Sequence, residues 1–347
     1  MFNLDNIVRE NIRKLVPYSS ARDEFAASSD GHTMLDANEN PFETGLNRYP
    51  DPYQKAVKQR LSEIKNVDPQ KIFVGNGSDE AIDLLIRAFC EPGKDRILIT
   101  PPTYGMYKVS ADINDAGIAE VPLNGEFQLN VEETLSRAEG CKLIFLCSPI
   151  NPTGNLLIRE DILKIAENFN GIVVVDEAYI DFCEKATLIN ELKNYPNLVI
   201  LQTLSKAWGL AGLRLGLAFA SEQIIQILNR IKPPYNVNIL TQQKVLEVLA
   251  QENLKNEQVQ FLLSEKERVC EGLKDLSIVE KIYPSDANFL LARFTQAREI
   301  FDFLQGKKVI IRDRSTLPGC EGCLRITIGT REENDTLLTE LKLYSNG

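Results

Sequence analysis

The sequence predicts an α/β fold, with a large domain whose mainly parallel sheet is covered by helices and a smaller α+β domain after it. From about residue 70 to 220, short apolar runs alternate with amphipathic stretches, which is the pattern of repeated strand–helix units. The run I-V-V-V at 172–175 is apolar at every position, as is typical of a parallel strand buried on both faces. At K-P-P-Y, residues 232–235, the alternation ends and long helical stretches begin.

Each expected strand is a short apolar run that ends in polar or turn-forming residues. In the large domain the expected strands are 72–74, 96–100, 118–122, 142–148, 172–176, 198–202 and 215–220, with helices at 79–90, 104–115, 131–139 and 159–168. In the small domain the expected helices are 238–253, 256–275 and one from 331, with strands at 278–282, 288–293, 308–311 and 323–328. We therefore divide the chain into an N-terminal helix and arm (1–30), a large domain (31–235) and a small domain (236–347).

The composition excludes several classes of partner. The chain of 347 residues has a net charge of −10 and a pI near 5.0, so neither nucleic acid nor an anionic membrane is expected to bind it. No apolar run approaches the roughly 18 residues that span a bilayer. Seven scattered cysteines, and an N-terminus without a signal-like apolar stretch, indicate the cytoplasm. One C-x-x-C, at 320–323, and one histidine supply too few ligands for a metal, so no metal is expected.

Ligands of parallel sheets bind beyond the carboxyl ends of the strands, so the loops that follow the predicted strands form the candidate site. The loop V-G-N-G-S-D-E at 74–80 joins a strand to a helix, whose free N–H groups at Ser78 and Asp79 would form an anion site. The same residues could simply cap the helix, so both interpretations stay open at this point. A nicotinamide dinucleotide is not indicated, because the third glycine of its fingerprint is missing.

Three further strand ends carry an aromatic or polar side chain. Tyr104, after the strand 96–100, can stack on a flat ring. Asn151 lies in S-P-I-N-P-T-G, a stiff turn that would hold its amide in place. Asp176 follows four apolar residues, and a carboxylate there is costly unless it meets a cation or a hydrogen-bond donor.

The segment T-L-S-K-A-W-G-L-A-G-L-R, residues 203–214, follows a predicted strand and contains Lys206. Thr203 and Ser205 supply hydroxyls, and Arg214 supplies a guanidinium eight residues after the lysine. Hydroxyls and an arginine beside a lysine suit a phosphate that is held next to an amine. Pyridoxal 5′-phosphate (PLP) carries both an aldehyde and a phosphate, so this cofactor fits the segment.

In this order, the motifs resemble those of the PLP-dependent fold-type I aminotransferases, and within them the family of histidinol-phosphate aminotransferases. The resemblance lies in the segments A-N-E-N-P (37–41), R-Y-P-D (48–51), G-S-D-E (77–80), P-P-T-Y-G-M-Y (101–107), D-E-A-Y-I-D-F (176–182), T-L-S-K-A-W-G-L-A-G-L-R (203–214), N-F-L-L (288–291), V-I-I-R-D (309–313) and C-L-R-I-T-I-G-T (323–330). It implies an aspartate aminotransferase-like fold and the transfer of an amino group between L-histidinol phosphate and 2-oxoglutarate, giving imidazole acetol phosphate and L-glutamate, in L-histidine biosynthesis. One departure is Ile150, where the family commonly has a second asparagine. The next peptide bond, Asn151–Pro152, would be cis.

The resemblance also implies a role for each residue of the cofactor site. Lys206 would bind the aldehyde of PLP and move the proton of the substrate, and Asp176 would pair with the ring nitrogen. Asn151 and Tyr179 would contact the 3-oxygen of the ring, and Tyr104 would stack on its face. The cofactor phosphate would be bound by hydroxyl, backbone and guanidinium groups of Ser78, Asp79, Thr203, Ser205 and Arg214.

On the substrate side, the resemblance implies that Arg325 binds the carboxylate of glutamate and, together with Arg312, the phosphate of histidinol phosphate. Asn151 would also contact the substrate, and Tyr18 would help to cover it. Tyr49 would reach the cofactor phosphate and substrate of the neighbouring subunit, which implies a homodimer with shared active sites.

Other functions are less well supported. An aromatic amino acid aminotransferase and a threonine-phosphate decarboxylase share the fold and remain alternatives within the class. A non-catalytic PLP-binding protein would lose its substrate arginines, whereas Arg312 and Arg325 are both present. A nicotinamide-dependent dehydrogenase would need a complete glycine fingerprint. The favoured interpretation is therefore the aminotransferase.

Overall fold

The computed structural model describes residues 2–18 and 33–346 of the chain. Its large domain is built on a seven-stranded sheet with the strand order β1-β7-β6-β5-β4-β2-β3. The strands are β1 (Ile72–Asn76), β2 (Arg96–Ile99), β3 (Gly117–Glu120), β4 (Cys141–Cys147), β5 (Ile172–Asp176), β6 (Leu198–Thr203) and β7 (Leu215–Phe219). The five strands from β6 to β3 are parallel to one another, and β7 runs antiparallel to both of its neighbours, β6 and β1. The predicted mainly parallel sheet is confirmed.

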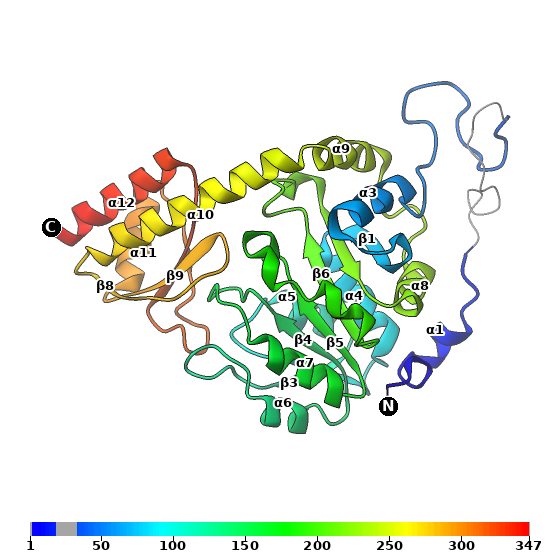
Figure 1. Cartoon of the computed structure of the whole chain (residues 1–347), viewed down its shortest axis with the longest axis horizontal. Coiled ribbons are helices and arrows are strands. Elements are labelled where there is room, and N and C mark those ends of the chain that lie inside the picture. The colour runs from blue at the N-terminus through cyan, green and yellow to red at the C-terminus, as the bar shows by residue number, and fades with distance from the viewer. Residues whose placement is uncertain (1, 19–32, 347) are drawn as a thin grey trace.

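Helices cover both faces of this sheet (Figure 1). Successive side chains of a strand point to opposite faces, so Val173 and Val175 of β5 join one core and Ile172 and Val174 join the other. The first core is closed by α3 (Lys55–Lys65), α6 (Val131–Arg137), α7 (Arg159–Asn168) and α9 (Ile239–Leu249). The second core is closed by α4 (Ser78–Phe89), α5 (Met106–Ile113) and α8 (Glu222–Ile231). A sheet buried on both faces explains why its strands are apolar throughout.

The small domain has an antiparallel sheet with the strand order β10-β11-β9-β8. Its strands are β8 (Val279–Ile282), β9 (Phe289–Phe294), β10 (Arg312–Asp313) and β11 (Cys323–Thr327), and its helices are α10 (Glu252–Lys274), α11 (Ala297–Gly306) and α12 (Arg331–Asn346). The long helix α10 runs from the large domain to the small one (Figure 1). Its end near Val269 and Leu273 packs in the core of the small domain.

Most predicted elements occur within a few residues of their expected bounds, but some predictions are wrong. No strand forms at 308–311, because β10 begins only at Arg312, where the chain first pairs with β11. In the described part of the predicted N-terminal arm, helix α1 (Glu10–Lys14) follows a 3-10 turn at Leu4–Asn6. Helices α3, α8 and α11 are present although they are not among the predicted elements. Among the helices described, none is both long and apolar enough to cross a membrane.

The described part of the N-terminal arm packs on the large domain. Leu4, Ile7 and Ile12 join the second core, and the Arg9 guanidinium pairs with the Glu91 carboxylate at 3.1 Å. Residues 1 and 19–32 of the predicted arm (1–30) and of the start of the large domain lie outside the described residues. Helix α9 contributes to the first core and contacts α3, whereas the boundary at residue 235 remains a prediction.

Candidate active site

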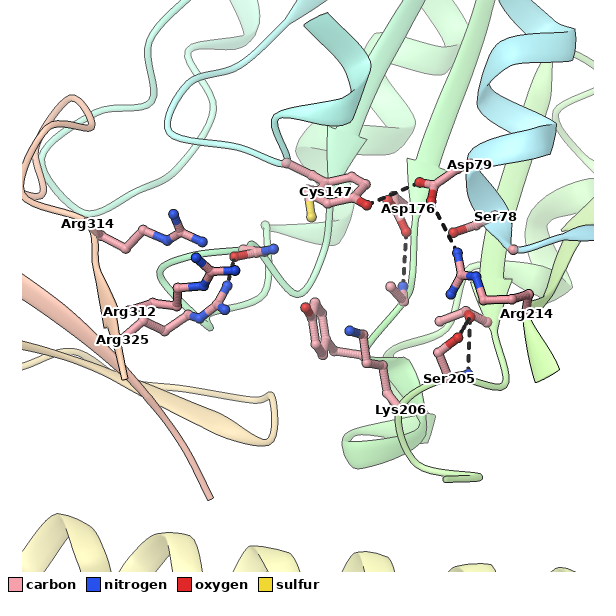
Figure 2. A pocket seen from close by; sticks show the side chains of 16 residues that line it. Ser78, Asp79, Cys147, Asp176, Ser205, Lys206, Arg214, Arg312, Arg314 and Arg325 are labelled. Carbon is pink, nitrogen blue, oxygen red and sulfur yellow. Dashed lines mark hydrogen bonds and ion pairs between the residues drawn. The ribbon is translucent and has the colours of Figure 1, made fainter. Parts of the chain in front are cut away.

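A cavity of about 290 Å³ lies at the carboxyl ends of β4, β5 and β6, with strands of the small domain on its other side (Figure 2). It is lined by Gly77, Ser78, Asp79, Tyr104, Cys147, Asn151, Asp176, Ala178, Tyr179, Thr203, Ser205, Lys206, Arg214, Arg312, Arg314 and Arg325. All of the predicted site residues except Tyr18 and Tyr49 are in this set. The rule that ligands bind at strand ends therefore locates the cavity correctly.

Asp176 is a buried carboxylate at the floor of the cavity, where β5 ends. Its side chain accepts hydrogen bonds from the Tyr107 hydroxyl at 2.7 Å and from the Ala178 backbone N–H at 3.1 Å. Burial raises the pKa of Asp176 to about 6, and the two hydrogen bonds offset only part of that rise. Two donors hold the carboxylate in one orientation, and a cation in the cavity would stabilise its charged form.

Lys206 lies just after β6, and its side chain reaches into the same cavity (Figure 2). Its Nζ is 5.5 Å from the centre of the Tyr179 ring. Burial and the positive charge of Arg325 lower the pKa of Lys206. An amine with a lowered pKa is neutral more of the time, so it is a better nucleophile and a better base.

One end of the cavity is an anion site at the start of α4. The Gly77 N–H donates to the Arg214 carbonyl at 2.7 Å, which fixes the arginine beside the helix terminus. Gly216 makes this approach possible, because a Cβ atom there would lie 1.9 Å from the Ser78 nitrogen. Thr203 bonds the N–H of Ser205 through its hydroxyl oxygen at 3.1 Å. Free N–H groups, hydroxyls and a guanidinium at one place suit a phosphate.

Tyr104 and Asp79 connect this anion site to the middle of the cavity. The Tyr104 hydroxyl donates to Asp79 Oδ1 at 3.1 Å, and the other Asp79 oxygen lies 3.6 Å from the Arg214 guanidinium. Burial and the nearby Asp79 charge raise the pKa of Tyr104, so its hydroxyl stays protonated. The Tyr104 ring meets the Tyr107 ring edge-on, at 5.6 Å between centres. These contacts fix the ring of Tyr104 at the cavity wall.

The other end of the cavity is formed by arginines of the small-domain sheet. Arg312 of β10 lies directly opposite Arg325 of β11 in the register of the two strands. The Arg325 guanidinium donates to the Asn151 side-chain oxygen and lies 5.2 Å from the centre of the Phe289 ring. Burial lowers the pKa of Arg325, and its Nε has no hydrogen-bond partner among the described residues. The predicted cis bond between Asn151 and Pro152 is confirmed.

A small apolar cluster fastens the two sides of the cavity together. It contains Tyr179 and Ala207 of the large domain with Val259 of α10 and Phe289 of β9. The rings of Tyr179 and Phe289 meet edge-on at 5.1 Å. Tyr179 lines the cavity and Ala207 follows Lys206 directly. This packing therefore sets the distance between Lys206 and the arginines of the small domain.

Several residues of the site were not identified from the sequence. Tyr107 of α5 donates a hydrogen bond to Asp176, and this contact joins segments far apart in sequence, so no local spacing signalled it. Arg314 lines the cavity, and its spacing of two from Arg312 would have revealed it if the strand had been placed correctly. Cys147 and Ala178 also line the cavity but offer no distinctive pattern, whereas Gly77 belongs to the loop 74–80 that the sequence indicated as an anion site.

Tyr18 and Tyr49 lie outside the cavity of their own chain. Tyr18 is 75% exposed, and Tyr49 is 49% exposed and stacks on Tyr235 with 4.4 Å between ring centres. Neither side chain lines the site that the same chain forms, so the structure does not bring them together with the other predicted residues.

Residues 32–341 match the family described as aminotransferase class I and II. The chain belongs to this class of enzymes. A histidinol-phosphate aminotransferase of Cytophaga hutchinsonii is 53% identical over 348 residues, which cover 99% of each protein. The chain is accordingly a member of the histidinol-phosphate aminotransferase family.

Solved structures of this family share the fold. The crystal structure of the histidinol-phosphate aminotransferase from Clostridium acetobutylicum matches with a TM-score of 0.80, over 87% of this chain and 92% of that one, at 24% identity. The enzyme from Sinorhizobium meliloti, crystallised in complex with pyridoxal-5′-phosphate, matches with a TM-score of 0.78, over 86% and 83% of the two chains, at 24% identity. The predicted fold class is therefore confirmed.

Proposed function

We propose that the chain is a PLP-dependent aminotransferase that transfers an amino group from L-glutamate to imidazole acetol phosphate, in L-histidine biosynthesis. The products are 2-oxoglutarate and L-histidinol phosphate. The observation that carries the proposal is that Lys206 lies between two cationic ends of one cavity, Arg214 at one and Arg325 at the other (Figure 2). A cofactor phosphate and a separate substrate anion need such an arrangement, with the reacting amine between them. The direct test is formation of glutamate from histidinol phosphate and 2-oxoglutarate by the purified protein.

The side chains of the cavity fit PLP group by group. Asp176 is a buried carboxylate without an ion pair to another described residue, so it would pair with the protonated ring nitrogen. Asn151 accepts from Arg325 through its oxygen, which leaves its NH₂ group to donate to the 3-oxygen of the ring. Burial raises the pKa of Tyr179, so its hydroxyl would be a second donor to that oxygen. Ser78, Asp79, Thr203, Ser205 and Arg214 would hold the phosphate, and Tyr104 would cover the ring.

PLP, when bound, withdraws electrons from the substrate carbon and stores the amino group between the two half-reactions. Lys206 would bind the cofactor covalently and, once displaced by the substrate amine, would act as the base. Its lowered pKa favours the neutral amine that can accept the proton of the substrate carbon. The same ammonium would then return the proton on the cofactor side. Asp176 would keep its charge beside the ring nitrogen throughout.

Two anions of different kinds would use the arginine end in turn. Arg325→Ala is expected to impair both half-reactions, whereas Arg312→Ala should impair chiefly the one with histidinol phosphate. The reason is that Arg325 is held at the cavity wall by Asn151 and Phe289, while Arg312 is more exposed and lies beside it on the strand edge. Loss of a desolvated charge partner costs on the order of 2–5 kcal/mol. Stopped-flow measurement of each half-reaction gives the two effects separately.

Arg298→Ala is a suitable control for these variants. Arg298 is also in the small domain, but it pairs with Asp302 on the surface of α11, outside the cavity. Normal half-reactions in this control would show that a small-domain arginine can be removed harmlessly. If Arg312→Ala slowed the half-reaction with glutamate as much as the one with histidinol phosphate, the assignment of Arg312 would be contradicted.

We also propose that the active enzyme is a homodimer in which Tyr49 completes the site of the partner. Support comes from Tyr49 being half exposed and outside the cavity of its own chain. The segment 33–53 around it presents large apolar side chains to solvent, namely Leu35, Phe42 and Leu46. A monomer rarely leaves such side chains exposed together, so a second copy would cover them. Tyr18 would lie at the entrance to the substrate site.

Shared sites predict complementation between two inactive variants. Lys206→Ala and Tyr49→Ala homodimers are both expected to be weak, whereas a dimer with one chain of each contains one site with both residues intact. Co-expression with two different affinity tags isolates this hybrid. Its activity should clearly exceed that of either parent. A hybrid no more active than its parents, although dimeric by light scattering, would contradict the sharing of Tyr49.

The place of this enzyme in the cell is proposed to be the cytoplasm. All seven cysteines are free, and five of the seven, Cys90, Cys141, Cys147, Cys320 and Cys323, lie buried in the domain cores. Unpaired thiols are typical of a reducing compartment, where amino acids are also made.

A further inference from the structure

The arginine end of the cavity has a high density of positive charge. Three guanidinium groups, those of Arg312, Arg314 and Arg325, line it (Figure 2). Within residues 2–18 and 33–346, none of the three forms an ion pair with a carboxylate. At the opposite end of the cavity, in contrast, Arg214 is accompanied by Asp79 at 3.6 Å. The arginine end is therefore electrostatically incomplete without an anion.

Strand geometry directs all three side chains to the cavity. Arg312 is the register partner of Arg325, and the pairing continues because the Arg314 N–H donates to the Cys323 carbonyl at 2.9 Å. Arg314 follows β10 in this paired segment, where alternate residues point to the same side, and both Arg312 and Arg314 line the cavity. Asp313 points away and accepts the Ser315 N–H at 2.8 Å. The carboxylate next in sequence is thus directed away from the guanidiniums.

The guanidinium of Arg314 is half buried and has free hydrogen-bond donors. Its Nε is buried, and its guanidinium donates no hydrogen bond to another described residue, whereas Arg325 already donates to Asn151. Burial and the charge of the neighbouring Arg312 lower the pKa of Arg314. A half-buried guanidinium beside a like charge is destabilising unless an anion arrives to accept its hydrogen bonds. The donors of Arg314 are therefore arranged for a ligand.

We propose that Arg314 is a third ligand of the substrate phosphate and a determinant of the preference for a phosphorylated substrate. The inference rests on the proposed function and deepens it. A phosphate monoester carries a charge of about −1.5 to −2 and three acceptor oxygens, so it can use a third guanidinium. A carboxylate has one charge and two oxygens, which a single bidentate arginine satisfies. Arg314 consequently contributes to binding of histidinol phosphate and little to binding of glutamate.

Arg314→Gln tests this assignment, because glutamine keeps most of the length of the side chain and removes its charge. The value of kcat/KM for histidinol phosphate is expected to fall on the order of 10- to 100-fold, as when a charge-assisted hydrogen bond is lost. The half-reaction with glutamate should change by less than about threefold. Arg314→Lys should recover part of the lost kcat/KM, since lysine restores the positive charge but not the paired N–H donors of a guanidinium.

Histidinol, which lacks the phosphate, separates phosphate binding from a structural role. The inhibition constants of histidinol phosphate and of histidinol are measured in the half-reaction with glutamate. Both constants are determined for the wild type and for Arg314→Gln. If Arg314 binds the phosphate, the variant binds histidinol phosphate more weakly than the wild type does, and its affinity for histidinol is nearly unchanged. Equal weakening of both compounds, or of the glutamate half-reaction, would make Arg314 a structural residue and overturn the proposal.

Arg298→Gln is the matched control, as a charge-removing change on the surface of the same domain. It should behave like the wild type in every assay. A wild type without activity on histidinol phosphate and 2-oxoglutarate would refute the proposed function itself. A fully active wild type with an unaffected Arg314→Gln variant would refute only the role of Arg314.

Discussion

Lys206→Ala is expected to abolish transamination while the protein still folds and still binds PLP. The variant loses both the covalent attachment and the base, and acid–base catalysis alone accounts for about 10²–10⁴-fold in rate. The cofactor contacts of the anion site and of Asp176 do not involve the amine and remain in place. Turnover is measured in the steady state, and PLP retention by absorbance after dialysis. Borohydride reduction followed by peptide mapping locates the attachment in the wild type.

Lys244→Ala is a control for this variant, because Lys244 pairs with Glu247 on the surface and lies outside the cavity. It should retain wild-type turnover and the wild-type attachment. Near-normal transamination by Lys206→Ala would refute the assignment. Attachment of reduced PLP to another lysine in the wild type would refute it equally.

Asp176→Asn is expected to lower the rate of transamination by several orders of magnitude with little effect on folding. An amide cannot keep the ring nitrogen protonated, so electron withdrawal from the substrate weakens. Each tenfold loss of rate corresponds to about 1.4 kcal/mol of activation free energy. The amide still matches the carboxylate in size and can accept the hydroxyl hydrogen bond of Tyr107. Single-turnover kinetics of PLP-loaded protein measure the loss without interference from product release.

Asp181→Asn provides the comparison, since Asp181 is also a buried acid just after β5. Its carboxylate pairs with Lys65 at 2.9 Å and does not line the cavity. This variant should lose thermal stability but keep its rate, which is the reverse of the result expected for Asp176→Asn. A rate of Asp176→Asn within about tenfold of the wild type would argue against pairing with the ring nitrogen.

The sequence was most informative where a charged residue directly follows an apolar, buried run. Asp176 follows an apolar run and Lys206 follows another, and both positions become strand ends that face one cavity. Parallel strands bring their carboxyl ends to the same edge, so residues about thirty apart in sequence could be assigned to one site. The same logic located Asn151 and Thr203.

What the sequence could not supply depends on pairing and packing. The apolar run 309–311 resembles a strand, yet a strand also needs a partner, and β10 pairs only from Arg312 onward. Because the strand was predicted at 308–311 and not from Arg312 onward, the common orientation of Arg312 and Arg314 was not recognised. Tyr107 was not identified from the sequence, because its hydroxyl hydrogen bond to Asp176 joins two elements far apart in sequence. Long-range contacts of this kind leave no local pattern.

Helix α3, which was not predicted from the sequence, has a similar explanation. Helix α3 begins after Gln54, a residue in the left-handed conformation, and presents only Val57 and Leu61 as buried apolar side chains. So few apolar positions give a weak helical period. The helix is stabilised largely by tertiary contacts. These include contacts with α9, which follows the segment K-P-P-Y (232–235) in the sequence.

The central claim, that this site exchanges the amino group of histidinol phosphate with that of glutamate, is tested most directly by single amino donors. PLP-loaded wild-type protein is mixed separately with L-histidinol phosphate, L-glutamate, L-phenylalanine and O-phospho-L-threonine, and conversion of bound PLP to the pyridoxamine form is followed by absorbance. The account predicts rapid conversion by histidinol phosphate and by glutamate. Conversion mainly by phenylalanine, or release of CO₂ from phosphothreonine without conversion by histidinol phosphate, would contradict it.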